Sequence, residues 1–262
     1  MRNKDGKRNQ MNIIGNESFH INSLVLHRIV PHESEFFEDV SFDTLRFLLS
    51  IQNLRFLSLD TAMLQNSEEN IICLTFDDGY SSDWDFVFPI LHEMGAKATF
   101  FVVTDWIGKP GFLSAEQIRK LHKSGMQIGS HSCSHPNLLG LDDSLLKGEL
   151  INSRLILEDL LGEPITSFSL PFGMGGASTI NAVLSCGYTH CCTSNHGILH
   201  GYSKIIPRNS INRYTKITSL QSIVQAGIGQ QYRWRIEDLS KSILKKYMTS
   251  LYFRIRSLIV GV

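Results

Sequence analysis

Short apolar runs alternate with longer amphipathic segments along most of this chain. The apolar runs predict strands over residues 24–30, 71–76, 99–103, 126–130, 166–170 and 188–193. The segments between them carry apolar residues at helical spacing and predict helices over residues 42–51, 82–94, 114–123, 142–161 and 179–185. Regular alternation of strands and helices predicts a parallel sheet. A length of 262 residues is enough for one barrel-sized domain with a substantial core.

The helix predicted over residues 114–123 has clear signals at both ends. Ser114 and Gln117 have the Ser-x-x-Gln form of a capping box, which satisfies backbone N–H groups at a helix start. Gly125 follows the last apolar position and suits the turn that ends a helix. These local signals fix the limits of this helix more closely than those of the others.

Acidic and histidine residues follow two of the predicted strands. Asp77 and Asp78 come directly after the second strand, where Gly79 allows the chain to turn so that both carboxylates converge. His131 and His135 follow the fourth strand, and their i, i+4 spacing puts both rings on one face if the loop takes a helical turn. Two imidazoles and one carboxylate suit Zn²⁺ or another divalent transition metal, and one carboxylate remains as a general base. The pattern predicts metal-assisted hydrolysis at the carboxyl ends of strands.

Two motifs carry a family resemblance. The Thr-Phe-Asp-Asp-Gly run at Thr75–Gly79 and the His-Ser-x-x-His run from His131 to His135 resemble the first two motifs of the polysaccharide deacetylases, carbohydrate esterase family 4. The resemblance implies an α/β fold, a distorted and partly open TIM-like (β/α) barrel of about seven strands. It implies removal of acetyl from an N-acetylated sugar in a glycan or glycan precursor. It also implies that Asp78, His131 and His135 bind the metal, usually zinc, and that Asp77 is the catalytic base.

The third motif departs from the family pattern. Residues 168–173 look like this motif, but Ser169 stands where many relatives carry an Arg that orients the base. Asp77 therefore needs another partner. Arg208, after the next strand-like stretch, is the candidate catalytic replacement, and a surface arginine at a strand end is the alternative.

The catalytic acid of the family is a late His that protonates the departing amine. No apolar strand followed by His occurs after Arg208, whereas Leu24-Val25-Leu26-His27 near the start of the chain has this form. The arrangement resembles a circularly permuted branch of exopolysaccharide and surface-polysaccharide deacetylases, in which this motif opens the domain. The resemblance assigns the acid to His27, with His196 and His200 as alternatives.

Three further residues are candidates for substrate binding. Phe172 follows Pro171 in the third motif, and its backbone N–H is the family-like donor to the oxyanion. Phe172 and Trp106 also offer apolar surfaces for a sugar ring or its acetyl methyl. Trp84 lies in a predicted helix, where core packing is the expected role.

The charge of the chain is balanced overall but uneven along it. Lys and Arg number 25, as do Asp and Glu, so composition does not point to nucleic acid. From Tyr232 onward seven Lys or Arg stand against Glu237 and Asp238, and apolar residues recur at helical spacing. Residues 231–262 are therefore predicted to form a basic amphipathic helix. Two roles stay open: peripheral contact with the inner membrane, or docking across the barrel as a final helix.

The remaining segments bear on domains and location. We expect a polar extension over residues 1–20, a deacetylase domain over residues 21–230, and the C-terminal helix after it. Residues 1–20 hold no apolar core of secretory length. The five cysteines are odd in number and lack paired spacing, so reduced thiols and a cytoplasmic location are expected. A sugar precursor or lipid-linked glycan is then the expected substrate.

Two alternatives to deacetylation remain. One is a carbon–nitrogen hydrolase that acts on a non-sugar amide such as a ureide or formamide. The other is a catalytically inactive glycan-binding or scaffold protein, which the missing third-motif Arg favours. Retention of both carboxylates and both histidines argues against the inactive protein.

Overall fold

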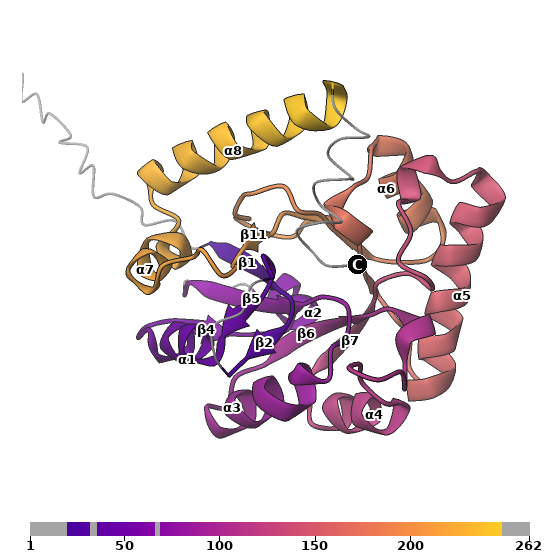
Figure 1. The fold of residues 1–262 in the computed structure, drawn as a ribbon, viewed down its shortest axis with the longest axis horizontal. Helices are drawn as coiled ribbons and strands as arrows, with labels where there is room; N and C mark the ends of the chain where they lie inside the picture. The colour runs from indigo at the N-terminus through magenta and orange to yellow at the C-terminus, as the bar shows by residue number, and fades with distance from the viewer. Residues whose placement is uncertain (1–19, 32–35, 66–68, 248–262) are drawn as a thin grey trace, which may run out of the picture.

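A parallel sheet forms the centre of the molecule (Figure 1). The computed structural model describes residues 20–31, 36–65 and 69–247, with side chains described as far as residue 240. The sheet follows the order β10-β9-β8-β7-β6-β5-β1-β11, with β4 paired to β5 outside this path. Every pairing in it is parallel. Its strands are β1 (Ile21–Leu26), β4 (Arg55–Phe56), β5 (Ile71–Phe76), β6 (Ala98–Val102), β7 (Gln127–Ser130), β8 (Ser167–Ser169), β9 (His190–Cys192), β10 (Ile205–Ile206) and β11 (Asn209–Ser210).

One short stretch of chain joins the two ends of this sheet. β10 pairs with β9, and β11 pairs with β1, yet only Pro207 and Arg208 separate them. The eight strands on the path therefore occupy seven positions around the barrel, because β10 and β11 share one. The predicted distorted (β/α) barrel of about seven strands is confirmed.

Helices pack around the outside of the barrel (Figure 1). The predicted helices correspond to α1 (Phe42–Ser50), α3 (Phe88–Glu93), α4 (Ala115–Lys123), α5 (Asp143–Leu161) and α6 (Ala177–Ser185). α3 is preceded by a π-helical turn, Asp83–Val87. The capping box is present, because Ser114 Oγ accepts from the N–H of Gln117 and the Gln117 side chain accepts from the N–H of Ser114.

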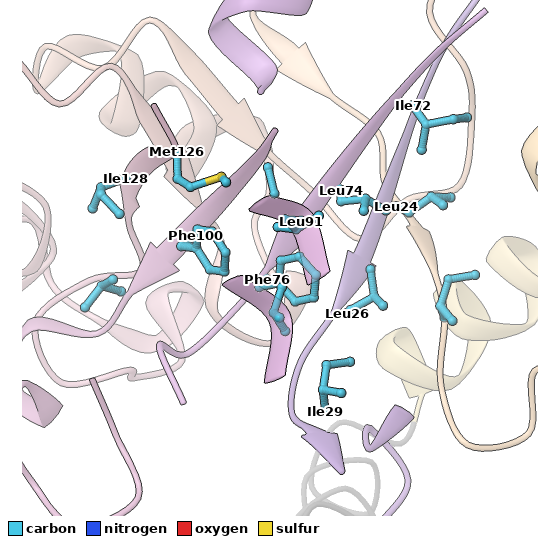
Figure 2. Close-up of a cluster of buried hydrophobic side chains, with 14 of the residues drawn as sticks. Leu24, Leu26, Ile29, Ile72, Leu74, Phe76, Leu91, Phe100, Met126 and Ile128 are labelled. Atoms are coloured by element: carbon cyan, nitrogen blue, oxygen red, sulfur yellow. The ribbon is translucent and has the colours of Figure 1, made fainter. Parts of the chain in front are cut away.

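The hydrophobic core has an outer and an inner part. Alternate strand residues point outward and pack under the helices, as Figure 2 shows for Leu24, Leu74, Phe76 and Phe100. The inner part is smaller and includes residues of α2 (Leu59–Met63) together with Phe101. Burial of these apolar faces is the main favourable contribution to folding. Ile21, Ile71 and Ile206 also belong to the inner part. Other inward strand positions, such as Thr75, Ser167 and Ser169, are polar and make buried hydrogen bonds.

Some predicted limits were wrong. The first strand covers residues 21–26 instead of 24–30, and residues 29–30 form β2 (Ile29–Val30), which pairs with β3 (Val40–Ser41) in a separate sheet. The start of the strand was missed because the polar Asn22 interrupts its apolar run. Its side-chain amide is buried and donates to the carbonyl of Ile223, 2.8 Å away, in α7 (Ile217–Gln225). The sequence pattern did not predict α2 or α7.

The last described helix, α8 (Ile228–Tyr247), packs on the barrel through its first half. Trp234 is 5% exposed, and its ring stacks on His196 with centroids 5.9 Å apart. The predicted domain boundary at residues 230 and 231 falls inside α8, while residues 1–19 and 248–262 lie outside the described residues. All five cysteines are described and none forms a disulfide. Among the described helices, none combines the length and apolarity needed to cross a membrane.

Candidate active site

The predicted site residues gather at the carboxyl ends of the barrel strands. Asp77 and Asp78 follow β5, His131 follows β7, and His27 follows β1. Parallel strands bring their carboxyl ends to one edge of a sheet, which is where barrel enzymes carry their reactive groups. Arg208 reaches the same region from the link between β10 and β11.

Asp78, His131 and His135 form a compact group. The Nε2 atoms of both histidines lie 3.4 Å from Oδ1 of Asp78, and one ligand atom from each residue lies within 4.8 Å of the others. Backbone geometry makes this possible, because Asp78 and Gly79 both have positive φ, 78° and 76°, and turn the chain at the strand end. The loop from His131 to His135 takes no helical turn. It contains two left-handed residues, Ser132 and His135. The sequence argument therefore predicted correctly that His131 and His135 are neighbours, but the predicted helical turn was wrong.

The protonation states of this group suit a divalent metal. Burial lowers the pKa of His135 to about 4, so its imidazole is neutral at pH 7. Burial alone would raise the pKa of Asp78, but the neighbouring imidazoles of His131 and His135 outweigh it and lower that pKa. The Nδ1 atom of His131 lies 2.8 Å from the carbonyl oxygen of Ser169, which assigns the ring proton to Nδ1 and directs Nε2 to the ligand group.

One atom of this group is suited to contact a cation. Oδ1 of Asp78 is buried and has no hydrogen-bond partner among the described residues. A buried carboxylate oxygen without a donor is costly, and a metal ion removes that cost. Two imidazoles and one carboxylate are ligands that zinc and related divalent ions accept. The residues present therefore fit a divalent transition metal.

Asp77 is held by Arg208 in a bidentate ion pair. The two guanidinium N–H groups donate to the carboxylate oxygens at 2.7 and 2.8 Å, and Arg208 is 1% exposed. The alternative of a surface arginine was wrong. Ser169 completes the contact, because its Oγ donates to Asp77 at 3.0 Å and accepts from Arg208 at 2.8 Å. The small side chain at position 169 leaves room for an arginine that arrives from a different strand.

The charge of Arg208 controls the carboxyl group of Asp77. Burial alone would raise the pKa of Asp77, but the Arg208 guanidinium, followed by His131, lowers it to about 2. Asp77 is therefore an anion throughout the neutral range. Its Oδ2 atom lies 3.8 Å from Nε2 of His131, so a proton acceptor stands beside the ligand group.

His27 lies at the edge of the same site. Its Nε2 is 3.7 Å from a carboxylate oxygen of Glu38, and one ligand atom from each of His27, Glu38 and Asp78 lies within 4.8 Å of the others. The segment that carries Glu38 is fixed by two hydrogen bonds from Arg28 to Asp39, at 2.9 and 2.7 Å. Sequence reasoning missed Glu38, because no spacing rule links it to His27.

The alternative acids lie elsewhere. Nδ1 of His196 is 2.7 Å from Asp238 in α8, and its ring stacks on Trp234. His200 follows Leu199, which pairs with Ile21 at the amino end of β1. Neither alternative belongs to a potential metal-ligand group among the described residues.

Aromatic rings surround His135. The ring of Phe172 lies 4.5 Å from the His135 ring and that of Trp106 lies 5.3 Å from it. Phe112 extends this surface by its contact with Trp106, 4.8 Å between centroids, and stacks on Tyr80 at 5.2 Å. Phe172, Trp106, Phe112 and Tyr80 together form an aromatic wall beside His135. Sequence reasoning missed Phe112 and Tyr80, because only the fold brings them next to Trp106.

Pro171 and Trp84 contribute in different ways. Pro171 is buried and precedes Phe172, whose φ of 57° is left-handed, so the third motif turns sharply beside His135. Trp84 stacks on Phe88, with centroids 5.1 Å apart, and packs against the outer core. Trp84 thus has the packing role expected from the sequence.

Comparison with known proteins agrees with this site. Residues 65–191 match the sequence model of the family described as polysaccharide deacetylase. The chain is 30% identical over 129 residues to the protein YxkH of Bacillus subtilis, which is 49% of this chain and 46% of that protein. It is 26% identical over 131 residues to a peptidoglycan-N-acetylglucosamine deacetylase of Bacillus cereus, which is 50% of this chain and 59% of that protein. The chain thus matches less than two thirds of the length of either relative.

Solved structures share the fold. The Streptococcus pyogenes deacetylase PplD in complex with acetate superposes with a TM-score of 0.70 at 22% identity, over 79% of this chain and 99% of that one. IcaB from Ammonifex degensii superposes with a TM-score of 0.65 at 20% identity, over 79% and 96%. The motif residues, the barrel and the sequence match agree, and residues 65–191 of the chain belong to the polysaccharide deacetylase family.

Proposed function

We propose that this chain is a metal-dependent N-deacetylase that removes acetyl from an N-acetylated sugar in a glycan or glycan precursor. The observation that carries the proposal is the ligand group of Asp78, His131 and His135 beside an ionised Asp77 that Arg208 holds in place. Membership of the polysaccharide deacetylase family supports the substrate class. We propose zinc as the metal, because its usual ligands are imidazole and carboxylate in a four-coordinate site.

Two residues of the chain carry out the two proton transfers, Asp77 as the base and His27 as the acid. A divalent metal held by Asp78, His131 and His135 would supply Lewis acidity toward the attacking water and the acetamide carbonyl. Asp77 accepts a proton from the water as its oxygen bonds to the carbonyl carbon. The backbone N–H of Phe172 stabilises the oxyanion that forms. His27 then donates a proton to the amide nitrogen as the C–N bond breaks, which leaves acetate and a free amine.

Arg208 gives Asp77 a fixed orientation for this step. A carboxylate held by two parallel N–H bonds cannot rotate away from the ligand group. The absence of the usual third-motif Arg had favoured an inactive protein. Arg208 and Ser169 together supply the contacts that this Arg was expected to provide, and that argument for inactivity loses its basis.

The aromatic wall supports recognition of a sugar. Trp106 and Phe172 flank His135, so an acetyl methyl or a pyranose face can pack on them next to the reacting carbonyl. Pro171 shapes the turn that presents Phe172. A non-sugar amide remains the alternative substrate class, since the same chemistry cleaves any accessible secondary amide.

We also propose that α8 contacts an anionic membrane surface from the cytoplasmic side. Four exposed apolar residues recur along one side of the helix at intervals of three or four: Ile228, Tyr232, Ile236 and Leu239. Arg233 and Arg235 supply positive charge beside them, as in helices that lie on lipid. Cosedimentation with phosphatidylglycerol vesicles, and its loss in the Ile236→Asp variant, tests this proposal. Equal recovery with and without vesicles would contradict it.

Acetate release tests the proposed activity directly. The metal-loaded wild-type chain and the Asp77→Asn variant are incubated with N-acetylglucosamine oligomers, lipid-linked N-acetylhexosamine, and a simple formamide. We expect acetate from at least one sugar substrate, and a loss on the order of 10²–10⁴ in rate for the variant. Release of formate from the formamide, with no acetate from any sugar substrate, would assign the chain to non-sugar amides. No release from any substrate by the metal-loaded wild type would contradict the proposal.

A further inference from the structure

The loop that carries both histidine ligands has an unfavourable backbone. Ser132 and His135 have φ values of 70° and 61°, in the left-handed region that residues with a Cβ atom rarely adopt. A loop of this kind keeps its shape only where surrounding contacts over-determine it. The contacts that hold this loop therefore decide whether His131 and His135 face one point before any metal arrives.

Glu149 of α5 supplies three of these contacts, beside backbone hydrogen bonds from the N–H groups of Thr104 and Asp105 to the loop carbonyls. Its Oε2 atom accepts hydrogen bonds from the backbone N–H groups of Cys133 and Ser134, at 2.8 and 2.9 Å. Its Oε1 atom accepts from Oγ of Ser134 at 2.7 Å. One carboxylate thus binds the two residues at the centre of the loop. Hydrogen bonds from N–H groups to an ionised acceptor are among the stronger ones in proteins.

The same turn of α5 holds the beginning of the loop. The carbonyl oxygen of Glu149 accepts from Oγ of Ser153 at 2.6 Å, and Ser153 lies 2.8 Å from Oγ of Ser130. Ser130 in turn accepts from the N–H of Ser132 at 3.3 Å. Helix α5 therefore reaches the loop at two points, one through a charged group and one through a chain of hydroxyls.

We infer that Glu149 is a positioning residue that preorganises the metal-ligand loop. The inference rests on the proposed function only in taking His131 and His135 as ligands. Glu149 does not coordinate the metal, and it belongs to no potential ligand group among the described residues. Its carboxylate fixes the backbone between the two histidines, so the protein does not have to order this segment when the metal binds. Groups that orient ligands in this way typically change metal affinity 10- to 100-fold when they are altered.

Zinc affinity of the metal-free protein is the test. Glu149→Gln keeps size and shape but puts an amide NH₂ where one acceptor oxygen stood, so it cannot satisfy all three donors. Glu158→Gln is the matched control, because Glu158 lies on the same helix and bonds to the N–H of Ile165 at 3.2 Å, away from the loop. Dissociation constants are measured by competition with a chromophoric chelator, and melting temperatures of the metal-free proteins are recorded beside them.

We expect Glu149→Gln to weaken zinc binding 10- to 100-fold while Glu158→Gln leaves it unchanged. The visible spectrum of bound Co²⁺ should change in Glu149→Gln only, since it reports ligand geometry. If Glu149→Gln does not fold, Glu149→Asp retains the charge on a shorter side chain, and a smaller loss of affinity is expected. Zinc binding by a folded Glu149 variant as tight as in the wild type would overturn the inference. Failure of the proposed function would look different, as tight zinc binding by the wild type without acetate release.

Discussion

The two ends of the barrel carry the same kind of polar contact for different purposes. Ser169 and Ser167 lie two residues apart on β8 and face the interior. At the carboxyl end, Ser169 joins Asp77 and Arg208. At the amino end, Ser167 lies 3.1 Å from Asp60 of α2, which also contacts Nδ1 of His190 at 3.1 Å. Each end thus has a carboxylate, a nitrogen base or cation, and a hydroxyl.

The difference lies in what stands beside each carboxylate. Asp60 accepts from Thr166 as well as from Ser167 and His190, so its oxygens are satisfied by residues at the starts of β8 and β9. No further potential metal ligands gather there among the described residues. Asp77 instead has Asp78 as its neighbour, with one buried oxygen that lacks a partner. The amino end holds strands and α2 together, whereas the carboxyl end gathers the potential metal ligands Asp78, His131 and His135 beside Asp77.

The largest effect should follow from His27→Asn. Loss of the proton donor to the amine should lower kcat on the order of 10²–10⁴, while His190→Asn at the other end leaves kcat within a few-fold. Steady-state deacetylation by both variants checks this contrast. A wild-type kcat in His27→Asn would mean that another residue is the proton donor. The His196→Asn variant would then be measured.

Arg208→Met should have the largest effect on stability. It leaves the Asp77 carboxylate buried without its cation, which typically costs about 3–5 kcal/mol. Urea unfolding of the metal-free variant measures the free energy of unfolding. A loss below about 1 kcal/mol would mean that Asp77 finds another donor, and the proposed orientation of the base would need revision.

Asp60→Asn should be milder and should depend on pH. Burial would raise the pKa of Asp60, but hydrogen bonds from His190 and Thr166 outweigh it and lower that pKa below its unfolded value. The charged form therefore stabilises the fold above about pH 4, and this contribution disappears as pH falls through the folded pKa. The side chain is about a third exposed, so we expect a loss of only ~1 kcal/mol at pH 7. The difference between the unfolding free energies of wild type and variant should shrink as the pH falls through the folded pKa of Asp60, and a difference independent of pH would contradict the assignment.

Ser169→Ala should have the smallest effect. Arg208 retains both bonds to Asp77 in this variant, so the free energy of unfolding should fall by ~1 kcal/mol, the value of one hydrogen bond. Deacetylation should fall only a few-fold. A loss of activity as large as that of His27→Asn would mean that Ser169 takes part in the reaction.

Regular local signals made much of the fold predictable. The alternation of apolar runs and amphipathic segments predicted the barrel, and the capping box fixed the start of α4 at Ala115. α2 was missed because five residues give too little periodicity. The polar Asn22 concealed the start of β1, since its buried amide is satisfied by α7, far away in the sequence.

The candidate site was predictable where motifs are local. Asp77, Asp78, His131 and His135 occur in short motifs, and the fold brings them together as expected. Arg208 was a candidate because the third motif lacks its usual Arg and Arg208 follows the next strand-like stretch, although only the structure shows the bidentate contact. Glu38 and Glu149 were not predictable, because each depends on how a helix or loop crosses a distant strand end.

The most direct test of the account is restoration of activity by stoichiometric metal. The wild-type chain is stripped with a chelator, and acetate release from an N-acetylglucosamine oligomer is followed as Zn²⁺ is added back. The account predicts no turnover in the stripped protein and a rate that rises linearly to a plateau at one equivalent. Turnover that is unchanged by stripping, or absent at any zinc level, would contradict a single metal centre at Asp78, His131 and His135 as the basis of activity.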